Sequence, residues 1–185
     1  MKEQRSLVAH VIDWLATAKE LIPEEKNDIF YPTKEQIINL HDYLIKEFQA
    51  EGEPNVQPGV LNDGPLDLIG IKYYENIKEN RWEDLIYKGA RLFNLFLEEG
   101  HPFIDGNKRT GFVTLWIFLT INKFDIKFEY FDYRTHYEKI RKWAELNSDD
   151  NIYEISIWIK ENETLFQRIK RCSINIINRI IKLNF

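Results

Sequence analysis

The chain has 185 residues, of which 44% are apolar and 14% aromatic, so it is long enough for one domain with a real core and is not intrinsically disordered. Its formal net charge of -5 makes nucleic acid an unfavoured partner. We expect a cytoplasmic protein with no membrane span and no internal disulfide, because no apolar run is long enough, the charged N-terminus is not a signal peptide, and Cys172 is the single cysteine.

Helical periodicity dominates the first part of the chain. Ser6 can cap a helix with one apolar face that continues to about Ile22. Thr33 and Gln36 have capping-box spacing and predict the start of a second helix. The apolar stripe of that helix consists of Ile37, Leu40, Leu44 and Phe48. Residues 51–66 are rich in Gly, Pro, Asn and Asp, which predicts a loop.

The second part of the chain is also predicted to be helical. A helix over residues 82–99 would turn Leu85, Gly89, Leu92, Phe93 and Phe96 inward. Residues 112–121 are apolar on almost every side, which predicts the buried central helix. Residues 122–130 suggest a turn and a short extended piece, followed by helices at about 133–146, 152–163 and 164–183. The predicted fold class is therefore all-α.

The last predicted segment, residues 164–185, is basic and amphipathic. It contains five lysines and arginines and no acidic residue. Such a helix can bind a membrane surface or a partner. The alternatives are that its apolar stripe, which includes Cys172, packs on the core or on a second subunit of a homodimer.

The run from His101 to Thr110 carries the chemistry of the chain. It places a histidine, a carboxylate, a glycine, a carboxamide and two cations within ten residues. Gly106 allows a sharp turn, and a helix is predicted to start at about Asn107. The first amides of a helix have no internal acceptor and lie at its positive end, so they form an anion site.

Each polar side chain of this run suits a phosphate site. Lys108 and Arg109 supply positive charge, and a guanidinium can bind phosphate oxygens in a bidentate way. Asn107 is a neutral donor for a phosphate oxygen. Asp105 is a hard oxygen ligand suited to Mg²⁺. His101 has the ordinary pKa of a general base. The run therefore predicts a site that moves a phosphate-bearing group from a nucleotide.

Simpler interpretations compete with this one. A histidine beside a helix end is often a cap or a packed residue, and Asp105 before Gly-Asn is a common turn pattern. Cations at a helix start are usually solvated, but they oppose the helix dipole, which favours a bound anion here. A zinc site is disfavoured because His101 and Asp105 supply two ligands where at least three are needed. The other histidines, His10, His41 and His136, have no zinc-binding spacing.

The run from His101 to Thr110 resembles the signature of the Fic/Doc family and is closest to its Doc (death-on-curing) branch. Residues 37–42 are similar to the first Doc helix, and residues 59–65 resemble the loop that forms a flap beside the Doc active site. The resemblance covers residues 31–163. It implies a compact Fic/Doc-like helical bundle, with residues 1–30 as an N-terminal helical extension and residues 164–185 as a C-terminal one, in a single globular unit.

The resemblance also implies roles for individual residues. His101 would deprotonate a hydroxyl group of a target protein, and Asp105 would hold Mg²⁺ on the phosphates of ATP, the co-substrate. Phe103 has no polar role and is expected to anchor the loop in the core. The expected phosphate- and nucleotide-binding residues are Gly106, Asn107, Lys108, Arg109 and Thr110.

Two positions depart from the Fic pattern and agree with the Doc pattern. Lys108 replaces a second glycine, and Phe112 replaces a second arginine that holds the terminal phosphates of ATP. The resemblance therefore implies a toxin of a toxin–antitoxin module, a kinase that transfers the terminal phosphate of ATP to a Ser/Thr hydroxyl of a protein such as a translation elongation factor. One alternative is a Fic-like AMP transferase, against which Lys108 and Phe112 count. The other is a catalytically silent binding module, against which the intact His101 and Asp105 count. Around Ser156 the Fic inhibitory-helix pattern is not matched, so an inhibitor would be a separate antitoxin protein.

Overall fold

The computed structural model describes residues 29–69, 81–98, 101–128, 133–165 and 167–168, and these residues form an all-α fold. The predicted helix over residues 6–22, Cys172 and most of the predicted C-terminal helix lie outside the described residues. None of the helices in the described part has both the length and the apolar character needed to cross a bilayer.

Helix α2 spans Lys34–Ala50 and begins with the predicted capping box. The Thr33 hydroxyl accepts from the Gln36 amide at 3.2 Å, and the Gln36 side chain accepts from the Thr33 amide at 2.8 Å. Ile37 and Leu44 of the predicted stripe are buried. The predicted loop after this helix is shorter than expected, because the short helix α3 (Gly64–Asp67) begins inside it.

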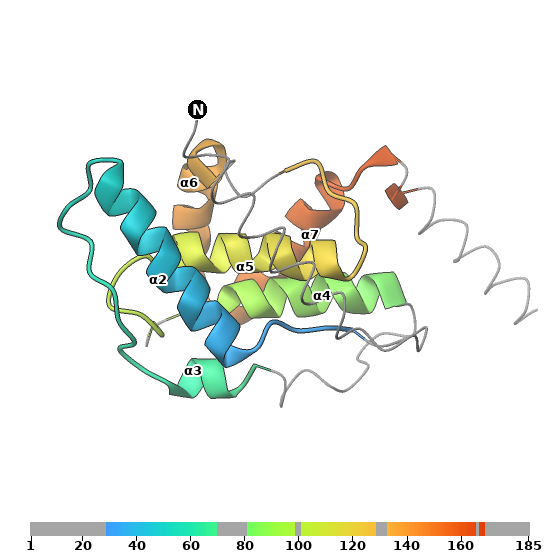
Figure 1. The fold of residues 1–185 in the computed structure, drawn as a ribbon. Coiled ribbons are helices and arrows are strands. Elements are labelled where there is room, and N and C mark those ends of the chain that lie inside the picture. Colours follow the sequence, from blue (N-terminus) through green and yellow to red (C-terminus); the bar gives the residue numbers. More distant parts are fainter. Residues whose placement is uncertain (1–28, 70–80, 99–100, 129–132, 166, 169–185) are drawn as a thin grey trace, which may run out of the picture.

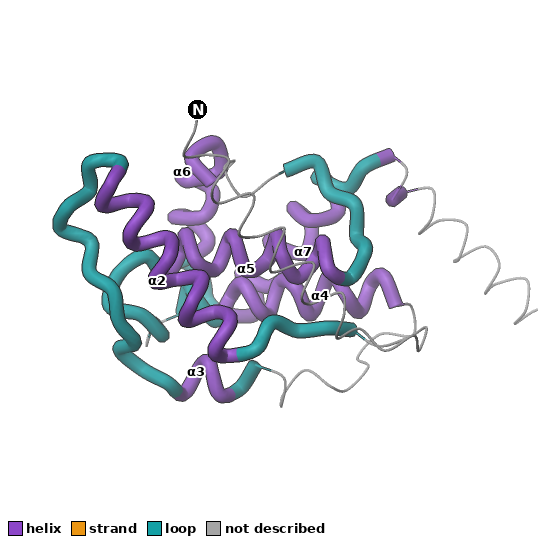
Figure 2. The backbone as a smooth tube through the Cα atoms, in the orientation of Figure 1, coloured by secondary structure: helices purple, strands orange, loops and turns teal. Residues whose placement is uncertain are grey.

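Helix α5 (Asn107–Ile121) is the central helix, as predicted, and it contacts α2, α4 and α6. Helix α4 (Arg81–Asn94) lies along it, and α2 crosses it (Figures 1 and 2). The α4–α5 contact is close at Gly111, where an added Cβ would lie 2.9 Å from Cδ2 of Phe93 on α4. The tight packing of these helices makes α5 a rigid support for the residues at its N-terminus.

Helix α4 ends at Asn94 rather than at residue 99 as predicted. The Asn94 side chain donates to Glu98 Oε1 at 2.5 Å and to Ser148 Oγ at 2.9 Å. It also accepts from Asn151 Nδ2 at 2.5 Å. These contacts tie the end of α4 to the start of α7. Phe96 lies in a turn directly after α4, in which its amide donates to the Phe93 carbonyl at 3.0 Å. It therefore still lies in the core, with no exposed surface.

Helices α6 (Tyr133–Trp143) and α7 (Ser148–Glu161) confirm two further predicted helices, with shifted ends. Helix α7 begins four residues earlier than predicted, because the Asn147 side chain caps it by accepting from the Asp150 amide at 3.0 Å. An aromatic cluster joins these helices to α4 and α5. Its members are Phe93, Phe112, Phe128, Tyr133, Trp143 and Trp158.

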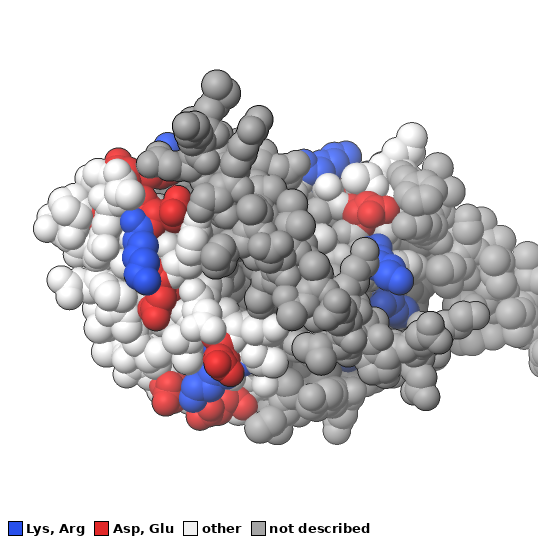
Figure 3. Space-filling view, in the orientation of Figure 1, with Lys and Arg blue, Asp and Glu red and all other residues white. Residues whose placement is uncertain are grey.

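The described surface carries charges of both signs. In Figure 3, acidic and basic side chains lie next to one another rather than forming a broad basic face. One such group joins Lys34, at the start of α2, to Asp63 at 3.3 Å and Asp67 at 2.8 Å.

Candidate active site

Phe103 fixes the loop before α5, residues 101–106, to the core. This side chain has no exposed surface and stacks on the His41 ring, with the ring centroids 3.7 Å apart and the planes 5° apart. Phe103 therefore anchors the loop in the core, as the sequence predicted. Phe103 also forms an antiparallel bridge with Val60, and the Leu61 amide donates to the Pro102 carbonyl at 2.8 Å. The loop predicted to resemble a flap thus lies directly beside the motif.

The Asn107 side chain closes this loop instead of projecting toward a ligand. Its Oδ1 accepts from the Phe103 amide at 2.9 Å, and its Nδ2 donates to the Phe103 carbonyl at 2.7 Å. Asn107 is 7% exposed. The amide and the carbonyl of Phe103 are buried and need hydrogen-bond partners, and the Asn107 carboxamide supplies both. In this arrangement the Asn107 side chain bonds to the protein backbone, and its predicted role toward a phosphate stays a prediction.

Thr110 is also turned inward, and its predicted role in nucleotide binding stays a prediction. It is 1% exposed, its hydroxyl lies 3.2 Å from His41 Nδ1, and its amide donates to the Gly106 carbonyl at 2.9 Å. The physical reason is its position one turn into α5, on the side that packs against α2. Neither its hydroxyl nor its amide is available to a phosphate.

His41 is the site residue that the sequence analysis missed. It lies on α2, has no exposed surface, and contacts Phe103 and Thr110 of the motif. Burial lowers the pKa of His41 to about 4, against the opposing influence of Asp42 and Asp105. The ring is therefore neutral at pH 7 and supports the loop by stacking. The available signal was its position in the helix, four residues after Ile37 and within the apolar stripe.

The N-terminus of α5 forms an uncapped anion site. Gly106 is the N-cap residue, with φ of 71°, and no side chain caps the helix. The amides of Asn107, Lys108 and Arg109 have no acceptor inside the helix because the helix begins there. A side chain at position 106 would be strained, and its Cβ would lie 3.1 Å from Ile45 Cδ1. The predicted role of Gly106 in anion binding is therefore compatible with its geometry.

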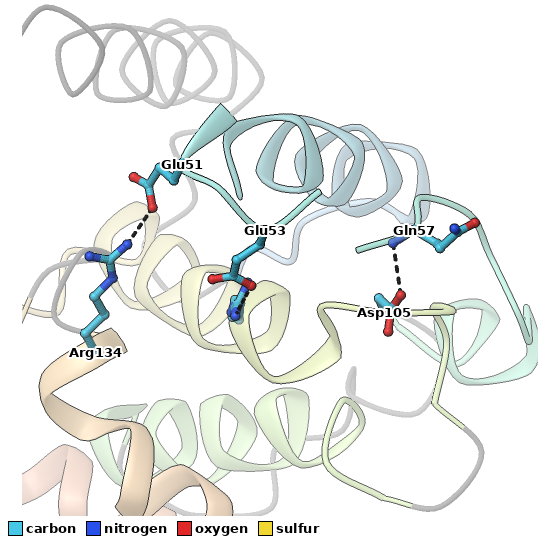
Figure 4. Close-up of polar contacts among 6 residues, drawn as sticks. Glu51, Glu53, Gln57, Asp105 and Arg134 are labelled. Atoms are coloured by element: carbon cyan, nitrogen blue, oxygen red, sulfur yellow. Dashed lines mark hydrogen bonds and ion pairs between the residues drawn. The ribbon is translucent and has the colours of Figure 1, made fainter. Parts of the chain in front are cut away.

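The charged residues of the motif, Asp105, Lys108 and Arg109, are all partly exposed. Figure 4 shows Asp105 beside Gln57 of the loop that follows α2. Asp105 Oδ2 accepts from the Gln57 amide at 2.9 Å. Arg109 Nη2 lies 2.6 Å from Glu53 Oε2. Lys108 is half-buried and makes no ion pair with any of the described residues. The site thus combines, around the open helix end, one carboxylate, one cation in an ion pair and one cation with no ion pair to the described residues.

Two aromatic side chains hold the Arg109 guanidinium. It lies 4.2 Å from the ring centroid of Phe48 and 5.8 Å from that of Tyr133. Burial raises the pKa of Tyr133 to about 12, and the Arg109 cation opposes this shift. The phenol therefore stays protonated, and this side of the site keeps its positive charge at neutral pH.

His101 comes at the start of the motif and is half-buried. Its Nδ1 is covered and has no hydrogen-bond partner among the described residues. Because Nδ1 is covered, a substrate hydroxyl could use only the other ring nitrogen, Nε2, as a general base.

Comparison with known proteins agrees with this geometry. A model of the Fic/DOC family matches residues 31–119, which include α2, α4, the motif and nearly all of α5. This part of the chain is therefore similar to the Fic/DOC family. Proteins of this family generally transfer groups from nucleotides, with ATP as substrate and usually with a metal ion. No curated protein and no solved structure matches the chain.

The residues of the motif fit a cation bound to a nucleotide better than a cation held by the protein alone. Among the described residues, no group of three or more His, Cys, Asp or Glu side chains comes together. Asp105 uses Oδ2 for the Gln57 amide, which leaves Oδ1 as a ligand. Mg²⁺ usually binds one or two carboxylates and completes its shell with substrate phosphates and water. The donor set at Asp105 fits a cation that arrives with a nucleotide.

Proposed function

We propose that this Fic/DOC domain is a Doc-like kinase toxin, which transfers the terminal phosphate of ATP to a Ser/Thr hydroxyl of a target protein. The observation that carries the proposal is the uncapped N-terminus of α5, with Lys108 beside it and with Asp105 and His101 in the loop that leads to it. Open amides and a cation bind phosphates, and the loop supplies a carboxylate and a base.

The proposed reaction uses few protein groups. The target hydroxyl loses its proton to His101 and its oxygen forms a bond to the terminal phosphorus, while the bond from that phosphorus to the bridging oxygen breaks and ADP leaves. The amides at residues 107–109 and Lys108 stabilise the charge on the phosphate oxygens. Mg²⁺ held by Asp105 would neutralise part of the phosphate charge.

Position 112 supports transfer of the terminal phosphate over transfer of AMP. Phe112 has no exposed surface and packs 5.3 Å from Phe128 and 5.9 Å from Trp158, measured between ring centroids. A cation at this position would be buried in the aromatic cluster of the core. The domain therefore lacks the second motif arginine that the AMP-transferring orientation of ATP would use.

The partners follow from the same proposal. The substrate is a protein with an accessible Ser/Thr hydroxyl, and a translation elongation factor is the first candidate to test. A separate antitoxin protein would control the toxin.

The deciding experiment is incubation of the protein and the candidate target with Mg²⁺ and ATP labelled at either the α or the γ phosphate. Label from the γ position in the target, confirmed as a phosphate adduct by mass spectrometry, supports the proposal. Label from the α position would replace it with AMP transfer. A target that takes up neither label would point to a binding module.

A further inference from the structure

A pocket lies at the end of α4, between the last residues of that helix and the turn that joins α6 to α7. Its volume is about 560 Å³, within the range of roughly 300–1,000 Å³ that is usual for ligand sites. Its floor consists of Asn94, Leu97 and Asn151, which are at most 3% exposed, and its exposed rim includes Glu98 and Glu145. The pocket shares no residue with the motif.

The Glu98 carboxylate is held in place at the rim by two hydrogen bonds. Its Oε1 accepts from Asn94 Nδ2 at 2.5 Å and from Ser148 Oγ at 2.6 Å. The other oxygen, Oε2, makes no hydrogen bond with the described residues, so a ligand can use it. A carboxylate that is already oriented loses little side-chain entropy when it binds a cation.

The floor of the pocket contains a hydrogen-bond acceptor that the fold does not use. Asn151 Nδ2 donates to Asn94 Oδ1 at 2.5 Å. Asn151 Oδ1 has almost no exposed surface and no hydrogen-bond partner among the described residues. A buried acceptor without a partner is costly, so a donor supplied by a ligand would be favourable there. Glu98 and Asn151 therefore both favour a ligand rich in hydrogen-bond donors.

The charge of the pocket is negative. Its lining includes two carboxylates, Glu98 and Glu145, and no lysine or arginine. Glu145 is only loosely paired with Arg141, at 3.8 Å between two exposed side chains. A metal ion is disfavoured, because no group of three or more His, Cys, Asp or Glu side chains comes together in the described part of the chain. An organic cation is the class of ligand that fits these groups.

We propose that this pocket binds the side chain of an arginine from a partner protein. A guanidinium carries five N–H donors in one plane, which suits two carboxylates and an amide oxygen. The aliphatic part of the arginine would lie against Leu97, Ala144 and Leu146, which also line the pocket. Free arginine fits less well, because no cation lines the pocket to pair with its α-carboxylate, which is a neutral amide in a protein.

The test uses three small probes and the full-length protein. N-acetyl-L-arginine methylamide represents an arginine within a protein, the matching citrulline compound is its neutral isostere, and free L-arginine represents the amino acid. Binding is followed by NMR through the backbone amide signals of residues 144–151. The capped arginine should shift these signals saturably and bind about tenfold more tightly than the capped citrulline. The signals of residues 107–109 should not move.

Two variants form a matched pair for this measurement. Glu98→Gln and Glu154→Gln each remove one negative charge, but Glu154 is exposed on α7 and does not line the pocket. Glu98→Gln keeps an oxygen for Asn94 and Ser148 and should weaken binding of the capped arginine about tenfold. Glu154→Gln should bind as the wild type does. Glu145→Gln, in an exposed turn, is the second variant and should weaken binding about threefold.

Several results would overturn the proposal. These are the absence of a saturable shift with the capped arginine, equal binding of the arginine and citrulline compounds, and equal affinities of Glu98→Gln and Glu154→Gln. Binding of free L-arginine as tightly as the capped compound would overturn the assignment to a protein side chain and make the pocket a site for the amino acid. None of these measurements involves phosphate transfer, so the proposed function is tested separately.

Discussion

The inner and outer sides of the motif differ in chemistry. The inner side consists of Phe103, Asn107 and Thr110, which are neutral, buried and bonded to one another or to His41. The outer side carries Asp105 and Arg109, whose partners lie on a half-exposed loop. Buried, satisfied contacts define the shape of the loop whether or not a ligand is present. Partly exposed polar contacts can exchange partners, so we expect the proposed binding chemistry on the outer side.

The largest effect is expected from His101→Ala, which removes the proposed base without touching either set of contacts. Phosphate transfer to the target should fall by roughly 10²- to 10⁴-fold, measured as initial rate with saturating ATP. The melting temperature should not change, because His101 makes no hydrogen bond through Nδ1 to the described residues. Transfer at close to the wild-type rate by the folded variant would remove His101 from this role.

On the inner side, Asn107→Leu should destabilise the fold by about 2–4 kcal/mol. The substitution keeps the volume but leaves the buried amide and carbonyl of Phe103 without partners. Urea unfolding at pH 7 measures the change. The matched control is Asn39→Leu on the exposed side of α2, which should stay within about 0.5 kcal/mol of the wild type. Similar stabilities for the two variants would contradict the proposed clamp.

His41 should make the inner side sensitive to acid. The pKa of His41 is lowered from 6.5 to about 4 in the folded protein, so between these values the unfolded chain binds more protons than the folded one. Stability from this group is therefore complete above pH 6.5 and is lost as the pH falls toward 4. From pH 7 to pH 5 the loss is about 2 kcal/mol.

The measurement is the difference in unfolding free energy between pH 7 and pH 5 for the wild type and for His41→Phe. The variant keeps a ring to stack on Phe103 but cannot titrate. Its loss of stability over this range should be smaller than that of the wild type by the amount assigned to His41. An unchanged pH dependence would show that the imidazole is not held neutral by burial.

The smallest expected effect concerns Asp105, the proposed metal ligand on the outer side. Asp105→Asn keeps an oxygen that can accept from the Gln57 amide but removes the charge. ATP binding in the presence of Mg²⁺ should weaken by about tenfold, whereas binding in EDTA should stay as in the wild type. Equal weakening in both conditions would mean that Asp105 shapes the loop and does not bind a cation.

Local sequence signals identified much of the fold. The capping box at Thr33 and Gln36 and the start of α5 at Asn107 depend on residues close together in the chain. The apolar run after Asn107 is enough to predict a buried central helix. The end of α4 was misplaced because Asn94 bonds to Ser148 and Asn151, which lie 54 and 57 residues away.

The sequence by itself therefore determined the all-α class, the Fic/DOC motif and the types of groups in the site, because capping, periodicity and a contiguous motif act over a few residues. Only the tertiary structure decided which side each motif residue faces. Thr110 meets His41 across 69 residues, and Arg109 meets Glu53 across 56. Contacts at such separations depend on how α2 and residues 51–57 pack against α5, and no local pattern in the chain specifies that packing.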